Sequence, residues 1–211
     1  MNGGIYILKA SGRLIPFSKK IEEIIKKVKS EVVQLLPLPD LDVIVEDNPL
    51  GAIEHLGIGG YAQNTYLINL YLDPKFPNIN NSIAKNLPRI LAHELHHAIR
   101  WQNPGYGKTL LEALVSEGLA DHFEMEYLDG EPEKWDLALT EKQLQKFSEL
   151  AKKEFTKEYD HNEWFFGMGD RNIPKWTGYT LGFNIVKKYL EKYPEKKPSQ
   201  LYSIQAQEVV K

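Results

Sequence analysis

The chain has 211 residues and a formal net charge of −3, with 26 Lys and Arg against 29 Asp and Glu. This length suits a single domain, and 42% hydrophobic residues suffice for a core, so the composition argues against disorder. The chain has six histidines and no cysteine, and the lack of cysteine excludes disulfides, thiol nucleophiles and cysteine-rich metal sites. The near-neutral charge argues against nucleic-acid binding, which usually needs a basic surface. Any metal ligands are therefore His, Asp or Glu.

The sequence carries no membrane signal. No stretch approaches 18 consecutive apolar residues, and the first residues lack the basic region and long apolar run of a signal peptide. We therefore expect a cytoplasmic protein without a membrane span.

The first third of the chain is predicted to be rich in strands. A strand over Ile5–Lys9 is followed by an amphipathic helix over about 18–36, in which apolar residues recur at helical spacing after a Ser18 N-cap. Leu41–Glu46 is predicted as a buried strand, and Thr65–Leu72 is the clearest strand in the chain. The Gly57-Ile58-Gly59-Gly60 segment lets the backbone bend or pass close to another group.

The rest of the chain is predicted to be helical. A loop over about 74–81 precedes it, and Trp164–Lys175 is a second predicted loop, rich in aromatic residues and glycine. Helices are predicted over about 88–102, 109–128, 133–158, 178–193 and 199–209. This order predicts one α+β domain over residues 1–211, with a strand-rich part in 1–80 and a helical part in 81–211.

The chemistry is carried by His93-Glu94-Leu95-His96-His97 on the first of these later helices. His93 and His97 are four residues apart, so both imidazoles leave the same helix face and can meet one ion. Glu94 then lies beside the metal, where it can take a proton from a metal-bound water. This is the H-E-x-x-H arrangement of zinc hydrolases. His96 points away, and we interpret it as a supporting or packing residue.

A catalytic zinc site needs a third protein ligand. Arg100 and Asn103 stand where the extended metalloprotease motif requires Gly and His, so that branch is excluded. Another histidine (His55, His96, His122 or His161) or a downstream carboxylate remains. Glu117 is the strongest candidate, because it lies on a largely apolar helix where a carboxylate is costly unless a cation satisfies it.

Three of the other carboxylates on that helix are candidates for a role in the site. Asp121 lies one turn after Glu117, so it can accept the Nδ1–H of a ligand histidine and fix its tautomer. Glu112 and Glu124 are alternatives to Glu117, although exposure to solvent suits them better. For His55 and His122 we expect ordinary packed positions.

The two segments together resemble a known family. His93-Glu94-Leu95-His96-His97 followed by Ser116-Glu117-Gly118-Leu119-Ala120-Asp121 is similar to the gluzincin zinc metallopeptidases, and most of all to the predicted zinc-dependent proteases numbered as domain of unknown function 2268. The resemblance covers about residues 40–195. It implies a zincin-like α+β fold, Zn²⁺ on His93, His97 and Glu117, Glu94 as the base, and Asp121 behind a ligand histidine.

Peptide hydrolysis also needs a donor for the developing oxyanion. Tyr179 is the first candidate, since a tyrosine after the metal helices often has this role in the peptidases that the chain resembles. His161 and Arg171 are alternatives. The Trp164–Gly169 segment is either a substrate lid or part of the core.

An extended peptide usually pairs with an exposed strand edge. Thr65–Leu72 precedes the zinc helix and is the predicted edge for a peptide or protein substrate, with Gly59-Gly60-Tyr61 at the rim.

The sequence therefore favours a zinc metallopeptidase. A zinc-binding regulatory or interaction protein without activity, and a hydrolase of non-peptide amides, are the alternatives. Substrate specificity, endo- or exopeptidase action and oligomeric state stay open.

Overall fold

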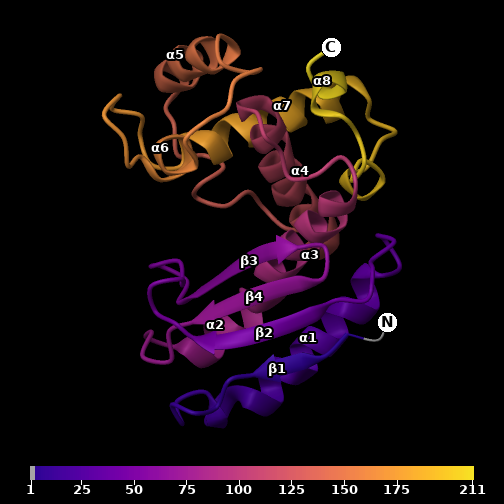
Figure 1. The fold of residues 1–211 in the computed structure, drawn as a ribbon, viewed down its shortest axis with the longest axis vertical. Coiled ribbons are helices and arrows are strands. Elements are labelled where there is room, and N and C mark those ends of the chain that lie inside the picture. Colours follow the sequence, from indigo (N-terminus) through magenta and orange to yellow (C-terminus); the bar gives the residue numbers. More distant parts are fainter. Residues whose placement is uncertain (1–2) are drawn as a thin grey trace. The chain divides into compact units, whose positions relative to one another are not determined.

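The computed structural model describes residues 3–211 and divides the chain into two compact units, Met1–Gln102 and Asn103–Lys211. The first unit holds all the strands and the second is helical (Figure 1). This mixture confirms the α+β prediction. The single-domain organisation and the zincin-like assignment stay predictions.

The first unit is built on a four-stranded sheet with the order β1-β2-β4-β3. Strands β1, β2 and β4 run parallel, and β3 is antiparallel to β4. Buried Val, Ile and Leu alternate with more exposed residues along β2 and β4, as expected for strands with one face in the core. The strand bounds are Ile5–Ile7 (β1), Asp42–Asp47 (β2), Ile58–Asn64 (β3) and Leu67–Leu72 (β4).

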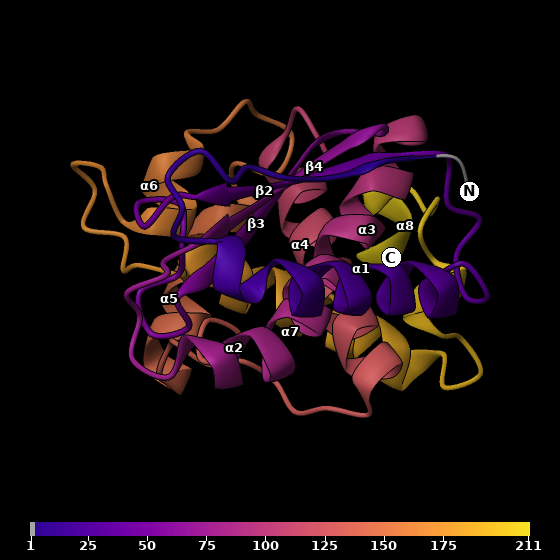
Figure 2. The ribbon, with the colours of Figure 1, turned by 90° about the horizontal axis from the view of Figure 1, so that it is seen from below.

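Helices α1 and α3 cover one face of this sheet (Figure 2). In α1 the residues Ile21, Ile25, Val28 and Val32 form a single buried stripe, which fixes the orientation of the helix on the sheet. Helix α3 packs on β3 and on α1, so the sheet positions the His-Glu motif. The helices of this unit are η1 (Ile15–Phe17), α1 (Ser18–Val32), α2 (Ile79–Lys85) and α3 (Leu87–Gln102).

The second unit is organised around the close crossing of α4 and α7. A Cβ atom on Gly118 would lie 2.2 Å from the Gly182 carbonyl oxygen, and one on Gly182 would lie 2.2 Å from the Leu114 oxygen. Any larger residue would force the two backbones apart. The helices of this unit are α4 (Leu110–Leu128), α5 (Glu141–Lys152), α6 (His161–Phe166), α7 (Thr177–Lys192), η2 (Pro198–Gln200) and α8 (Ala206–Val209).

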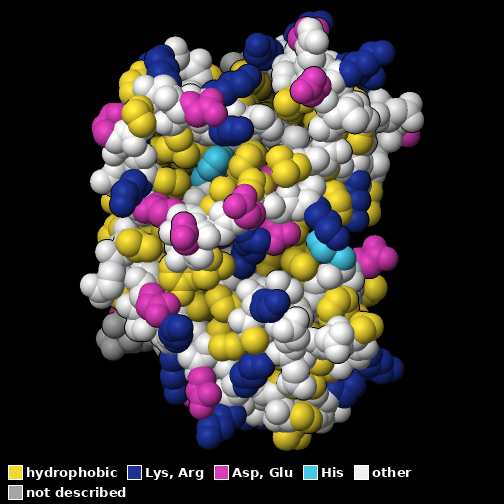
Figure 3. Space-filling view, turned by 180° about the vertical axis from the view of Figure 1, so that it is seen from behind, with side chains coloured by type: hydrophobic (Ala, Val, Ile, Leu, Met, Phe, Trp, Pro, Cys, Tyr) yellow, Lys and Arg dark blue, Asp and Glu magenta, His cyan; other side chains and the backbone are white. Residues whose placement is uncertain are grey.

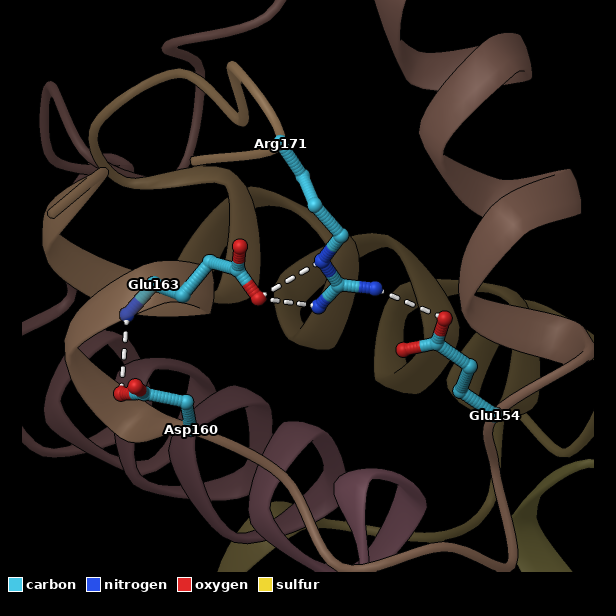
Figure 4. Close-up of polar contacts among 4 residues, drawn as sticks. All are labelled: Glu154, Asp160, Glu163 and Arg171. Carbon is cyan, nitrogen blue, oxygen red and sulfur yellow. Dashed lines mark hydrogen bonds and ion pairs between the residues drawn. The ribbon is translucent and has the colours of Figure 1, made fainter. Parts of the chain in front are cut away.

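Local capping and ion pairing hold α6 and its flanking segments together. Asp160 accepts a hydrogen bond from the Glu163 backbone at the start of α6, at 3.2 Å. The Arg171 guanidinium bridges Glu163 and Glu154, with a 2.7 Å bond to Glu154 (Figure 4). The loop after α6 is therefore tied both to this helix and to the segment that follows α5.

The sequence predictions were wrong for four elements. Helix 133–158 is shorter, because the Thr140 capping box starts α5 only at Glu141. Helix α6 reaches into the predicted loop at 164–175, and α2 overlaps the loop predicted at 74–81. The helix predicted over 199–209 is limited to α8, Ala206–Val209, which follows the short η2. Of the two possibilities for the glycine-rich segment around Gly59, the close approach holds, because the segment is part of strand β3 and Gly60 lies against Glu94.

The predicted edge strand was also wrong. Strand β4, Leu67–Leu72, lies between β2 and β3, so the outer strands of the described sheet are β1 and β3. Among the described residues, no helix combines the length and the apolar character needed to cross a membrane.

Candidate metal centre

The two motif histidines lie side by side on α3. Their Nε2 atoms are 3.0 Å apart, and the ring centroids are 4.6 Å apart at an interplanar angle of 79°. Two nitrogens that share a tetrahedral zinc ion at 2.0–2.1 Å are about 3.3 Å apart. The pair His93 and His97 therefore has a spacing that fits joint ligation of one metal ion, as the helical spacing predicted.

Glu94 is held by the neighbouring strand. Its Oε2 accepts a hydrogen bond from the Ala62 backbone amide of β3 at 2.7 Å, and Gly60 on the same strand packs against the carboxylate. A Cβ atom on Gly60 would lie 2.6 Å from Glu94 Cγ and 2.9 Å from Oε1. The glycine thus leaves the space that the carboxylate occupies, which is the close approach that the glycine-rich sequence allowed.

The end of α3 is fastened to the same strand residue. The Trp101 indole N–H donates to the Ala62 carbonyl oxygen at 3.0 Å. Both backbone groups of Ala62 are therefore bonded to α3, through Glu94 and through Trp101. This pair of bonds sets where α3 lies along β3. Neither bond was predicted, because nothing in the sequence pairs Trp101 with a strand residue 39 positions earlier.

Glu117 lies on α4 within the second unit. The Tyr106 hydroxyl donates a short hydrogen bond to Glu117 Oε1, and the Ser116 hydroxyl donates to the Tyr106 carbonyl oxygen at 2.5 Å. Burial, and next the negative charge of Glu117, raise the pKa of Tyr106 well above its usual value, so this phenol stays protonated. Sequence reasoning missed Tyr106, which stands in a loop and belongs to no motif.

Asp121, also on α4, is fully buried and belongs to a group of buried carboxylates. Its Oδ1 accepts the Trp135 indole N–H at 3.2 Å, and Glu124 and Asp136 are also fully buried. Burial, followed by the charge of Asp121, raises the pKa of Asp136 to about 10. Asp136 is therefore protonated at neutral pH. The contact between Asp121 and a ligand histidine stays a prediction.

Three candidates for the oxyanion donor occupy different surroundings. Tyr179 packs edge-to-face on Phe165, with centroids 5.0 Å apart, and His161 stacks on the same ring at 4.4 Å. The Arg171 guanidinium is already engaged by Glu154 and Glu163. The Trp164–Gly169 segment was predicted to be either a substrate lid or part of the core. Its residues Trp164 and Phe165 are in the core.

His122 is an ordinary packed histidine, as predicted. Its Nε2 lies 3.1 Å from the Phe183 carbonyl oxygen, and its ring stacks on the Phe183 ring at 4.3 Å. Burial lowers the pKa of His122, so the ring is neutral at physiological pH.

Comparison with known proteins identifies a family. Residues 17–211 match the sequence profile of domain of unknown function 2268, described as a predicted Zn-dependent protease. The uncharacterized protein YjaZ of Bacillus subtilis (strain 168) is 35% identical over 112 residues, which cover 48% of this chain and 41% of that protein. The match thus spans less than half of the relative's length. No solved structure matches the chain.

Proposed function

Because the chain belongs to domain of unknown function 2268, a family of predicted zinc-dependent proteases, we propose that it is a zinc metallopeptidase that hydrolyses peptide bonds. The observation that carries this proposal is the 3.0 Å approach of the His93 and His97 Nε2 atoms with Glu94 between them on α3. A purely structural metal site would not require a carboxylate at that position.

We propose His93, His97 and Glu117 as the metal ligands. Two imidazoles and one carboxylate, with a fourth position open, are the donor set of many catalytic zinc sites. The Tyr106 hydroxyl bond to Glu117 would hold that carboxylate in a fixed orientation. Bound zinc supplies Lewis acidity, which lowers the pKa of water and polarises a carbonyl group.

Glu94 is the proposed general base. The Ala62 amide fixes its Oε2 at 2.7 Å, so proton transfer falls to Oε1. In this role Glu94 takes a proton from the attacking water and returns it to the leaving amine nitrogen. The hydrogen bond from a strand amide keeps the carboxylate oriented without a flexible side-chain partner, which favours a fixed reaction geometry.

Substrate is proposed to pair with β3 rather than with the predicted Thr65–Leu72. The backbone groups of Ala62 point outward from the sheet, because both bond to α3. The Ile58 carbonyl also points outward and accepts from Ile53 at 3.2 Å. Backbone orientation alternates along a strand, so Gly60, midway between them, points outward as well.

Gly60 is the open position of this edge. Within residues 3–211, no hydrogen bond to the outward amide or carbonyl of Gly60 is present, whereas Ile53 and α3 occupy the positions on either side. A substrate would then form one pair of backbone hydrogen bonds, at Gly60, next to Glu94. Most of its specificity would have to come from side-chain contacts.

A combined metal and activity measurement tests the proposal. Purified protein should contain one zinc per chain by elemental analysis and should cleave members of a peptide library, with activity lost on chelation and restored by zinc. Bound zinc without cleavage of any peptide or denatured protein would contradict the proposed activity and favour a zinc-binding interaction protein. Cleavage that survives complete metal removal would contradict the proposed mechanism.

A further inference from the structure

The second unit contains an apolar groove that shares no residue with the proposed metal site. It is lined by residues of α5 and α7, by Phe155 and by residues 209–211. Its volume is about 470 Å³, within the usual range for small-molecule sites. The apolar residues that line it are Leu144, Ala151, Phe155, Leu181, Ile185, Val209 and Val210.

The charged residues along this groove are all basic. They are Lys152, Lys188, Lys192 and Lys211, and no Asp or Glu lines the groove. Across the described residues 3–211 none of these four forms an ion pair, in contrast to the adjacent Lys187, which lies 3.9 Å from Glu191. A chain with a net charge of −3 thus presents lysines without an ion-pair partner beside an apolar groove.

The surface around α5, α7 and α8 carries charges of both signs. In the upper part of Figure 3, where Figure 1 labels these helices, Lys and Arg side chains lie beside hydrophobic ones, and Asp and Glu side chains are visible as well. Burial raises the pKa of Tyr189, and the nearby acidic residues Glu208 and Glu195 raise it further, but neither of them lines the groove. The groove therefore combines an apolar floor with four lysines in its lining.

We propose that this groove binds a long-chain carboxylic acid, with the alkyl chain on the apolar floor and the carboxylate among the lysines. The chemistry matches at both ends, because burial of an alkyl chain is favourable and lysine stems can pack on it while their ammonium groups meet the anion. Tyr189 adds a hydroxyl group to the same lining.

The volume favours a single alkyl chain over a peptide. A helix with its side chains is about 10–12 Å across, so two turns of an acidic amphipathic helix would occupy more than this groove offers. The groove is also separate from the proposed peptidase site, since every lining residue lies within 144–211 and none belongs to the proposed metal centre.

Calorimetric titration with dodecanoate below its micelle concentration tests this site. We expect one dodecanoate per chain, with dodecanol and butyrate each binding at least tenfold more weakly, because each lacks one half of the recognised chemistry. No binding of dodecanoate, or equal binding of dodecanol, would overturn the proposal. Tighter binding of an acidic amphipathic peptide than of dodecanoate would indicate a protein partner and would also overturn the proposal.

A matched pair of charge reversals on one helix locates the carboxylate. Lys188→Glu should weaken dodecanoate binding at least tenfold, whereas Lys187→Glu, at the neighbouring position outside the lining, should change it less than twofold. Ser148→Phe should block binding by filling the groove, while Gln145→Phe, exposed on the same helix, should not. Equal effects of the two members of either pair would overturn the assignment of this groove. Unchanged melting temperatures would show that the variants fold.

Discussion

The substitution Gly60→Ala tests whether β3 sets the position of the proposed base. The added methyl group would lie 2.6 Å from Glu94 Cγ and 2.8 Å from Ile90 Cγ2, whereas non-bonded carbons are normally about 3.5–4.0 Å apart. The overlap is therefore about 1 Å. Because the Glu94 side chain is flexible and the strand backbone is not, we expect the carboxylate to move.

The magnitude follows from the geometry of catalysis. A displacement of about 1 Å at a catalytic group can cost about 100-fold in rate, so kcat for peptide cleavage should fall by about two orders of magnitude. Zinc content should stay unchanged, since the three atoms nearest to the added methyl group belong to Glu94 and Ile90 and not to His93 or His97. The melting temperature should change by only a few degrees, because alanine also reduces the entropy of the unfolded chain.

The control is Gln63→Ala on the same strand, where the side chain is exposed and activity should be retained. Full activity of Gly60→Ala would refute the view that this glycine makes room for the catalytic base. Loss of both zinc and fold in this variant would contradict the view that Gly60 positions the base without affecting metal binding. A change in KM without a change in kcat would show that Gly60 acts on substrate docking alone.

Three further predictions concern the second unit. Glu117→Ala should lose zinc by elemental analysis while keeping its circular dichroism spectrum; retained zinc would contradict its role as a ligand. For Asp136→Asn, the melting temperature relative to that of the wild type should rise as the pH rises from 5 to 9. Folding raises the pKa of Asp136 from 3.8 to about 10, so unfolding releases a proton in this window and the wild type loses stability with rising pH. A pH-independent difference would contradict this. Gly118→Ala should lower the melting temperature by several degrees, because its methyl group would lie 2.2 Å from the Gly182 carbonyl oxygen; an unchanged value would contradict the close helix crossing.

The helical part of the site could be predicted because its chemistry is local. The four-residue spacing of His93 and His97 determines that both rings share one face of α3, and the structure brings their Nε2 atoms to 3.0 Å. The apolar sequence around Glu117 likewise predicted a buried carboxylate, and Glu117 is 4% exposed. The assignment of Glu117 to the metal stays a proposal.

The strand that supports Glu94 could not be predicted, because its stability comes from partners distant in sequence. Ile58–Asn64 contains two adjacent glycines, which are unfavourable in an isolated strand. Pairing with β4 and the bonds of Ala62 to Glu94 and Trp101 outweigh this preference. The wrong assignment of the sheet edge to Thr65–Leu72 followed directly from this missed strand.

Tyr106 was missed for a related reason. It lies in the loop before α4, in no periodic pattern, and gains its role only when the Ser116 hydroxyl binds its backbone carbonyl. Such contacts depend on the folded path of a loop, which composition and spacing do not determine.

The most direct test of the proposed function compares Glu94→Gln with the wild type on one cleaved peptide at equal zinc content. The amide keeps the size of the side chain and can still accept the Ala62 hydrogen bond, but it cannot take up the proton from water. The proposed mechanism predicts one zinc per chain in both proteins and a loss of activity of at least about 100-fold in the variant. Wild-type activity in Glu94→Gln would contradict the assignment of Glu94 as the base and, with it, the proposed mechanism.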